Sequence, residues 1–266
     1  MLRLARIAAI SCFVCISVVS LSEAKIDPET AVGVWLFDEG TGNDTKDSSG
    51  KGHHGQINGA KWKNGKFGKG LEFNGGQWVE IKSTPELQAG NQLTMMAWFY
   101  ATKIDDWRQL IAKSNEYLLR IDPPGEGNRM SAFVKPNGSW EPRASSRVPE
   151  KKTWIHFAAT YDSKAKNEHL IVYVNGVQAG VSTRPGKITW TENPVEIGRW
   201  GGGSFFVGII DEAAIFNIVL GEEDLQTIMD QGLAKVIGGG TPVSPIGMLA
   251  STWSKLKYKR TRVNGR

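Results

Sequence analysis

The stretch Gly208-Ile-Ile-Asp-Glu-Ala-Ala-Ile-Phe-Asn217 places two neighbouring carboxylates inside an otherwise apolar run. A β-strand buries one face and exposes the other, and consecutive side chains point to opposite faces. Asp211 and Glu212 are therefore predicted to face apart, with one of them inward or at the rim of the strand. A carboxylate placed there needs hydrogen-bond partners, a cation or both. The pattern predicts the last strand of a β-sandwich, in which Asp211 anchors a metal ion or a hydrogen-bond network.

Short strand-like segments alternate with turns along the chain, which contains 31 glycines among 266 residues. Short strands at such intervals are typical of an all-β sandwich. Asn175-Gly176 suits a type I′ turn, and Asn74-Gly75-Gly76 predicts a second hairpin, between 70–73 and 78–81. Acidic residues at 222–224, followed by apolar residues at helical spacing, predict one short helix that Gly232 ends. The predicted strands are 32–37, 70–73, 78–81, 93–101, 108–113, 117–121, 130–134, 153–161, 170–174, 177–181, 195–197 and 208–217.

The N-terminus has the pattern of a signal peptide. Arg3 and Arg6 precede an apolar run at 7–21, and small residues follow, which predicts cleavage after Ala24. The run is too short for a permanent membrane span, so the mature chain is predicted to be secreted, periplasmic or held at the cell surface without a transmembrane segment. A lipid anchor is the less favoured alternative. The chain's two cysteines, Cys12 and Cys15, lie inside the predicted signal peptide, so no disulfide is expected in the mature protein.

The rest of the chain divides into a predicted domain at 25–237 and a Gly/Pro-rich linker with a basic tail at 238–266. Residues 25–240 carry 24 basic and 26 acidic side chains, whereas the tail from 241 carries 6 basic and no acidic ones. A body with almost no net charge argues against a nucleic-acid partner. The tail is predicted to be a solvated end, a contact with an anionic envelope or polysaccharide, or an attachment segment.

Six motifs occur in a fixed order between residues 32 and 232. They are Trp35-Leu-Phe-Asp-Glu39, Asp47-Ser-Ser-Gly-Lys-Gly-His-His-Gly55, Gly68-Lys-Gly-Leu-Glu-Phe73, Trp154-Ile-His-Phe-Ala-Ala-Thr-Tyr-Asp162, Tyr173-Val-Asn-Gly176 and Gly208-Ile-Ile-Asp-Glu212. With these motifs the chain resembles the laminin-G-like, concanavalin A-like jelly-roll family in its bacterial secreted form. The resemblance implies an all-β fold, a two-sheet antiparallel jelly-roll sandwich with one short helix after the last strand. This fold carries lectins, glycosidases, adhesion modules and structural domains, so it implies less about function.

The resemblance also implies a structural calcium ion between the first and last strands. The matching acids are Asp38 and Asp211, and backbone carbonyls of the loop at 47–55 are candidates for the remaining ligands. Calcium takes about six to eight oxygen ligands from carboxylates, carbonyls and waters. In the alternative interpretation the two acids bind only backbone N–H groups of turns.

Catalysis is disfavoured by the spacing of the acids. Retaining glucanases of this fold carry a Glu-x-Asp-x-x-Glu strand, which places its acids on one face, and this spacing is absent from the chain. The adjacent pairs Asp105-Asp106 and Asp211-Glu212 face apart in an extended segment. The chain is therefore predicted not to be an enzyme, and a divergent glycoside hydrolase is the last alternative.

Tryptophans in predicted loops are the candidates for ligand contact. Sugars bind through aromatic ring faces and a few directed hydrogen bonds, so a loop tryptophan beside polar residues suits a glycan. In the alternative interpretation these rings only cover the ends of the sandwich. The predicted function is a secreted, non-catalytic module for glycan binding or cell-surface interaction, and the main alternative is a structural or adhesion domain with a protein partner. The predicted ligand-binding residues are Trp107, Trp140, Arg143, Trp190, Arg199 and Trp200.

Overall fold

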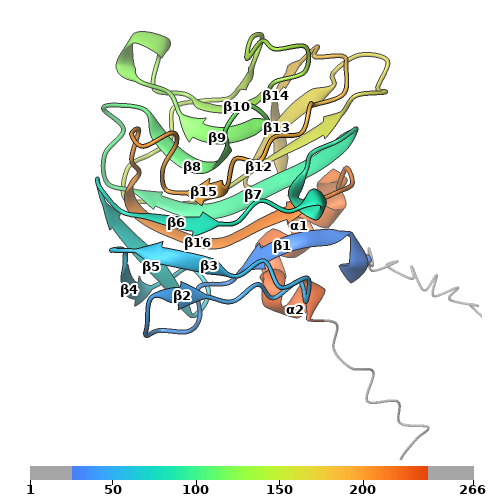
Figure 1. Ribbon diagram of the computed structural model, residues 1–266. Coiled ribbons are helices and arrows are strands. Elements are labelled where there is room, and N and C mark those ends of the chain that lie inside the picture. The colour runs from blue at the N-terminus through green and yellow to red at the C-terminus, as the bar shows by residue number, and fades with distance from the viewer. Residues whose placement is uncertain (1–25, 239–266) are drawn as a thin grey trace, which may run out of the picture.

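The computed structural model describes residues 26–238, which form two antiparallel β-sheets with a pair of short helices at the end (Figure 1). The predicted signal peptide at 1–24 lies outside the described residues, as do the linker and tail beyond residue 238. Within 26–238, no helix is long and apolar enough to cross a membrane. The two-sheet architecture confirms the predicted jelly-roll sandwich.

The two sheets each contain eight strands. In spatial order, sheet A consists of β14 (Val177–Ser182), β13 (Leu170–Val174), β12 (Trp154–Asp162), β7 (Gln92–Ala101), β16 (Val207–Phe216), β5 (Lys69–Asn74) and β4 (Lys61–Asn64), with β1 (Ala31–Trp35) paired to β16. Sheet B consists of β11 (Ala144–Ser145), β10 (Met130–Val134), β9 (Tyr117–Ile121), β8 (Arg108–Lys113), β15 (Val195–Ile197), β6 (Trp78–Ile81), β3 (Gly55–Asn58) and β2 (Asp44–Thr45). Every predicted strand coincides with one of these, and the short strands β2, β3, β4 and β11 were not predicted.

The main core lies between the sheets and follows from alternation along each strand. In β7, Met95, Ala97 and Phe99 point into the large apolar cluster, whereas Met96 between them points outward. On the other side of the core, β9 contributes Leu119 in the same manner. Burial of this apolar surface is the main stabilising contribution, because each fully buried large side chain contributes about 1.5–3 kcal/mol.

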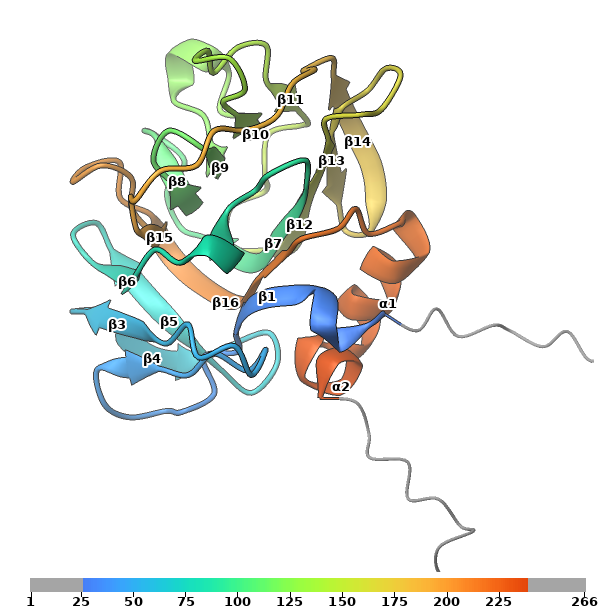
Figure 2. The same cartoon turned by 45° about the vertical axis from the view of Figure 1, so that its right-hand side comes forward.

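Two helices cover part of the outer face of sheet A. The helix α1 (Glu222–Gln231) confirms the predicted helix and ends at Gly232, after which α2 (Leu233–Ile237) begins. Figure 2 shows both helices beside β1 and β16. Apolar residues of the helices, such as Leu225 and Leu233, pack with Met96 and Phe216 in a second cluster. The helix α2 was not predicted, because five residues are too few to show a helical period.

The predicted hairpin around Asn74-Gly75-Gly76 is wrong. β5 pairs with β4 and β16 in sheet A, whereas β6 pairs with β3 and β15 in sheet B. The turn therefore connects the two sheets instead of pairing its flanking strands. By contrast, Asn175 and Gly176 both have positive φ and join the paired strands β13 and β14, as predicted.

The prediction that Asp211 and Glu212 face apart is also wrong, because β16 contains a bulge at this point. The register against β7 shifts between Asp211 and Ala214, and Glu212 has a left-handed backbone with φ 44°. Asp211 binds the loop at 65–69, whose Phe67 packs against the outward Trp98, and Glu212 accepts a hydrogen bond from the Leu233 N–H of α2 at 3.0 Å. Both carboxyl groups thus lie on the outer side of sheet A, and neither enters the core between the sheets.

The buried His156 is expected to make the stability of the folded chain depend on pH. It lies on the outer face of β12 at 1% exposure, next to the Trp98 ring at 5.4 Å, and its ring nitrogens have no hydrogen-bond partner among the described residues. Burial lowers the pKa of His156 from 6.5 to about 4, because it disfavours the imidazolium. As the pH falls, the imidazole is therefore protonated in the unfolded chain before it is protonated in the folded chain. The stability that neutral His156 provides above pH 6.5 is thus lost as the pH falls towards 4.

We expect this residue to lower the free energy of unfolding by about 3 kcal/mol across that pH range. Urea unfolding of the wild type and of His156→Gln at both ends of the range isolates this contribution, since all other titrating groups are shared. The control is His54→Gln, because His54 is exposed. An equal pH dependence in wild type and His156→Gln would contradict the prediction.

Candidate functional site

The outer face of sheet B carries a cluster of aromatic rings. Leu118 and Phe133 form part of a small apolar patch there, against which Trp140 and Trp200 pack. The Trp140 ring lies edge-on to Phe133, with centroids 6.4 Å apart, and edge-on to Trp200 at 6.1 Å. Both tryptophans are half-buried, so their rings are held in place while part of each remains accessible. We call this set the Trp140–Trp200 surface; it consists of Phe133, Trp140 and Trp200, together with Arg120 and Arg143.

Arg120 reaches this surface because of the alternation in β9. Leu119 and Ile121 point into the core, so Arg120 between them points outward. The registers of β8, β9 and β10 place Gln109, Arg120 and Ser131 in one cross-strand row. A charged side chain in an otherwise apolar strand thus arrives on the outer face at a defined position.

Arg120 and Arg143 form a shared network with two carboxylates. Arg120 Nε lies 2.7 Å from Asp122 Oδ1, and its Nη2 lies 2.6 Å from Glu126 Oε2. Arg143 Nη1 lies 3.3 Å from Asp122 Oδ2 and also binds Glu126. The two guanidinium groups lie over the Phe133 ring, at 4.3 Å and 5.2 Å from its centroid. Each arginine is therefore fixed by carboxylates at its head and by an aromatic ring beneath.

These contacts determine the charge state of Glu126. Burial works to raise the pKa of Glu126, but the hydrogen bond from Arg143 and the charges of both arginines outweigh it and lower the pKa below its usual value. The indole of Trp107 contributes to the same lowering. Trp107 is 42% exposed and directly precedes β8, so it lies at the margin of this network.

Arg199 fixes the loop that carries Trp200. Its Nε lies 2.8 Å from Glu196 Oε1, and Glu196 Oε2 accepts the Gly201 N–H at 2.9 Å. The Arg199 guanidinium stacks on Trp78, 3.8 Å from the ring centroid, and its Nη2 lies 3.5 Å from Glu80 Oε2. Arg199 therefore links the Trp140–Trp200 surface to the outward side chains of β6.

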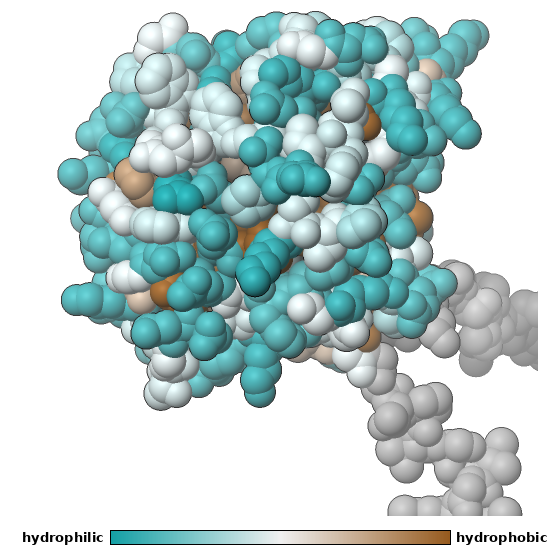
Figure 3. All heavy atoms as spheres, in the orientation of Figure 1, coloured by the Kyte–Doolittle hydropathy of each residue, from teal (hydrophilic) through white to brown (hydrophobic). Residues whose placement is uncertain are grey.

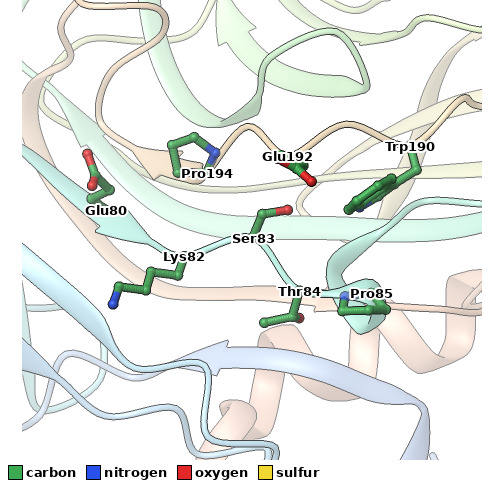
Figure 4. A pocket seen from close by; sticks show the side chains of 8 residues that line it. All are labelled: Glu80, Lys82, Ser83, Thr84, Pro85, Trp190, Glu192 and Pro194. Carbon is green, nitrogen blue, oxygen red and sulfur yellow. The ribbon is translucent and has the colours of Figure 1, made fainter.

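Trp190 lies beside a separate groove, shown in Figure 4. The groove has a volume of about 420 Å³, and Trp190 is 43% exposed. One wall comes from β6 and the segment after it, and the other from the segment between β14 and β15. We call it the Trp190 groove. Its lining residues are Glu80, Lys82, Ser83, Thr84, Pro85, Trp190, Glu192 and Pro194.

A buried ion pair holds the segment that carries Trp190. Lys113 and Glu116 are both fully buried, with Lys113 Nζ 2.5 Å from Glu116 Oε1. Lys113 Nζ also donates to the Thr191 carbonyl at 2.6 Å, and the Thr191 N–H donates to Glu116 Oε1 at 2.8 Å. The residue next to Trp190 is thus bound through both its backbone groups, which gives the groove wall a fixed position.

Figure 3 shows a largely hydrophilic face in the orientation of Figure 1. Apolar residues appear on it only as small, separate patches. Surfaces that bind protein partners through apolar contact usually present larger continuous patches. On the face seen in this view, apolar residues are therefore scattered among polar ones and form no large continuous patch.

The structure places five of the six predicted ligand residues around one surface and the sixth at the neighbouring groove. The five are Trp107, Trp140, Arg143, Arg199 and Trp200. Arg120 and Phe133 were not predicted as ligand residues; they lie in the predicted strands 117–121 and 130–134. The alternation of β9 was a usable signal for Arg120, whereas the position of Glu196 beside Arg199 follows from a loop conformation that alternation does not predict.

The predicted calcium ligands Asp38 and Asp211 both bind the loop at 65–69. Asp211 Oδ2 accepts the N–H groups of Lys66 at 2.8 Å and Phe67 at 2.9 Å, and its Oδ1 accepts the Glu212 N–H at 2.8 Å. Asp38 Oδ1 accepts the Lys69 N–H at 2.7 Å. Side chains at 65 and 68 would collide with these carboxylates, which explains the glycines at both positions.

Burial dominates the electrostatics of the two acids in the β16 bulge. It raises the pKa of Asp211 to about 8 and that of Glu212 to about 7, although backbone N–H groups partly offset the effect. The negative charge of Glu212 adds to the increase at Asp211. Within residues 26–238, no group of three or more His, Cys, Asp or Glu side chains is arranged to hold a metal ion. The carboxylate oxygens of Asp211 face N–H donors, an arrangement that suits the hydrogen-bond network better than a cation.

Calcium at Asp38 and Asp211 thus stays a prediction with a direct test. A bound ion stabilises only the folded chain, so removal with EDTA should lower the melting temperature and added calcium should restore it. Differential scanning calorimetry in both conditions measures the effect, with magnesium as the control ion. An unchanged melting temperature would leave these acids with the hydrogen-bonding role alone.

Comparison with known proteins identifies the family of this chain. The family model described as the concanavalin A-like lectin/glucanases superfamily matches residues 73–226, and comparison with curated proteins found no match. One similar solved structure is domain 4 of AbnA, a GH43 extracellular arabinanase from Geobacillus stearothermophilus, in complex with arabinotriose. It is 23% identical to this chain, with a TM-score of 0.60, and the comparison covers 75% of this chain and 98% of that chain.

Two toxin binding domains share the fold at lower identity. The binding domain of Paraclostridial Mosquitocidal Protein 1 is 12% identical with a TM-score of 0.60, and that of Botulinum Neurotoxin DC in complex with SialylT is 12% identical with a TM-score of 0.59. Each comparison covers 76% of this chain and 52% of the toxin chain, so this chain spans about half their length. At these identities the likenesses show the fold alone. By the match to its family model, the chain belongs to the concanavalin A-like lectin/glucanase superfamily.

Proposed function

We propose that this protein is an exported, non-catalytic module that binds a glycan on the Trp140–Trp200 surface. The single observation that carries the proposal is the packed pair of half-buried tryptophans, Trp140 and Trp200, beside arginines fixed by carboxylates. Aromatic rings provide the apolar platform that sugar C–H faces need, and directed polar groups around them provide specificity. The fixed positions of these side chains reduce the entropy lost on binding.

The charge states of the carboxylates support a binding role over hydrolysis. Glycoside hydrolysis needs a carboxylic acid with a raised pKa beside a second carboxylate. On the Trp140–Trp200 surface, arginines lower the pKa of Glu126, which keeps it ionised and unable to donate a proton. The carboxyl groups whose pKa is raised, Asp211 and Glu212, are buried on the outer side of sheet A beneath a loop and a helix.

The neighbours in fold guide the choice of probes. Domain 4 of AbnA was solved with arabinotriose and the neurotoxin domain with SialylT, so a panel should contain arabino-oligosaccharides and sialylated glycans. The panel should also contain uncharged xylo- and cello-oligosaccharides, polygalacturonate and dextran sulfate, so that the probes differ in both sugar backbone and charge. Incubation of the same panel with the protein, followed by product analysis, separates binding from hydrolysis.

We expect Trp140→Ala and Trp200→Ala each to weaken glycan binding by about tenfold or more, because each removes ring area from the platform. Isothermal titration calorimetry with the best probe measures the loss. The matched control is Trp154→Ala, since Trp154 is also half-buried but packs against Tyr100 on sheet A. Unchanged affinity in both platform variants, or an equal loss in the control, would contradict the assignment of the site.

A further inference from the structure

The Trp190 groove adjoins the Trp140–Trp200 surface through β6. The outward residues Trp78, Glu80 and Lys82 follow one another at intervals of about 6–7 Å, as alternate residues of a strand do. Trp78 stacks under Arg199, Glu80 contacts Arg199 and also lines the groove, and Lys82 lines the groove. The Trp140–Trp200 surface and Trp190 therefore belong to one band along the outer face of sheet B.

The band is longer than the groove itself. A second hollow of about 570 Å³ shares Glu80, Lys82 and Thr84 with the Trp190 groove and continues over the outward residues of β3 and β2. It brings the Gln56 amide and the exposed His54 imidazole to the same band. A concave path that continues past a single platform fits a ligand with several repeating units.

The charges along the band argue against an anionic ligand. Each of the arginines Arg120, Arg143 and Arg199 already contacts carboxylates that offset its charge, so an incoming sulfate or uronate would meet negative charge beside every arginine. Acidic side chains also outnumber basic ones. The acidic set is Glu80, Asp122, Glu126, Glu141, Glu192 and Glu196, and the basic set is Lys82, Arg120, Lys135, Arg143 and Arg199.

We infer that the ligand is an uncharged linear saccharide chain, which extends from the Trp140–Trp200 surface along β6 into the Trp190 groove. The inference rests on the proposed function and adds the class and length of the ligand. Trp190 acts as a second platform, and the Lys113–Glu116 pair positions it through Thr191. Hydroxyl groups of the chain meet the carboxylates and Lys82 at the groove walls.

The test compares chain length with the position of the substitution. Isothermal titration calorimetry uses the uncharged series that the wild type binds best, from the trisaccharide to the octasaccharide. We expect Trp190→Ala to leave the affinity for the trisaccharide unchanged and to lower that for the octasaccharide by about tenfold. Trp200→Ala should weaken both. Trp190→Phe, which keeps a smaller ring, should recover most of the loss, and the unfolding midpoint of each variant should match that of the wild type.

The outcomes separate the inference from the function on which it rests. Equal affinities of wild type and Trp190→Ala at every length would overturn the second platform, as would an equal loss at every length. Preference for polygalacturonate or dextran sulfate over the uncharged series would overturn the ligand class, while the glycan-binding function would stand. Failure of the wild type to bind any probe would reject the function itself, and the inference with it.

Discussion

Glu116→Ala is expected to lower the free energy of unfolding by about 3–5 kcal/mol. The substitution leaves the fully buried ammonium of Lys113 without its carboxylate, and an unpaired buried charge is strongly destabilising. It also removes the acceptor for the Thr191 N–H, so the segment that carries Trp190 should loosen. Urea unfolding followed by circular dichroism measures the loss, and saccharide titration reports on the groove.

Two further variants test the cause. In the double variant Lys113→Met with Glu116→Leu no charge remains buried, so the loss should be smaller than in Glu116→Ala, although Thr191 keeps unpaired backbone groups. Lys63→Ala is the control for an exposed pair, because Lys63 is half exposed and lies 3.7 Å from Glu72, and its unfolding midpoint should barely change. A double variant as unstable as Glu116→Ala would show that charge burial is not the source.

The second large effect is expected at Asp211. Asp211→Ala removes an acceptor with 0% exposure that binds three backbone N–H groups, and it leaves those donors, one buried and two partly buried, without their partner. Since each unsatisfied buried donor costs about 1–3 kcal/mol, we expect a total loss of about 3–5 kcal/mol in the free energy of unfolding. Guanidinium unfolding at neutral pH measures it.

Asp211→Asn distinguishes the hydrogen bonds from the charge. Burial raises the pKa of Asp211 to about 8, so near neutral pH the carboxyl is mostly protonated and an amide resembles it. The amide oxygen can still accept from Lys66 and Phe67, and we expect a loss of only about 1–2 kcal/mol. A loss as large as that of Asp211→Ala would show that the negative charge, and not the acceptor, is required.

The loop tryptophans could be identified from the sequence as candidates for ligand binding, but the residues that they contact in the fold could not. Trp140 and Trp200 stand beside polar and glycine residues, a local pattern that indicates exposure. Their contact with each other joins residues 60 positions apart in the chain, and Arg120 reaches the same surface from β9, a strand whose other residues are all apolar or aromatic. Such convergence depends on which strands become neighbours, and strand order is a long-range property.

The sequence by itself determined the turn at Asn175-Gly176, the helix that ends at Gly232 and all the strands except the short β2, β3, β4 and β11, because alternation, turn chemistry and capping act between near neighbours in the chain. Only the tertiary structure decided which sheet each strand joins, as the turn at 74–76 shows by connecting two sheets instead of closing a hairpin. It also decided that Asp211 and Glu212 share one side, since the register between β16 and β7 shifts at a bulge between Asp211 and Ala214. These outcomes depend on pairing and packing between distant segments, which local residue patterns do not encode.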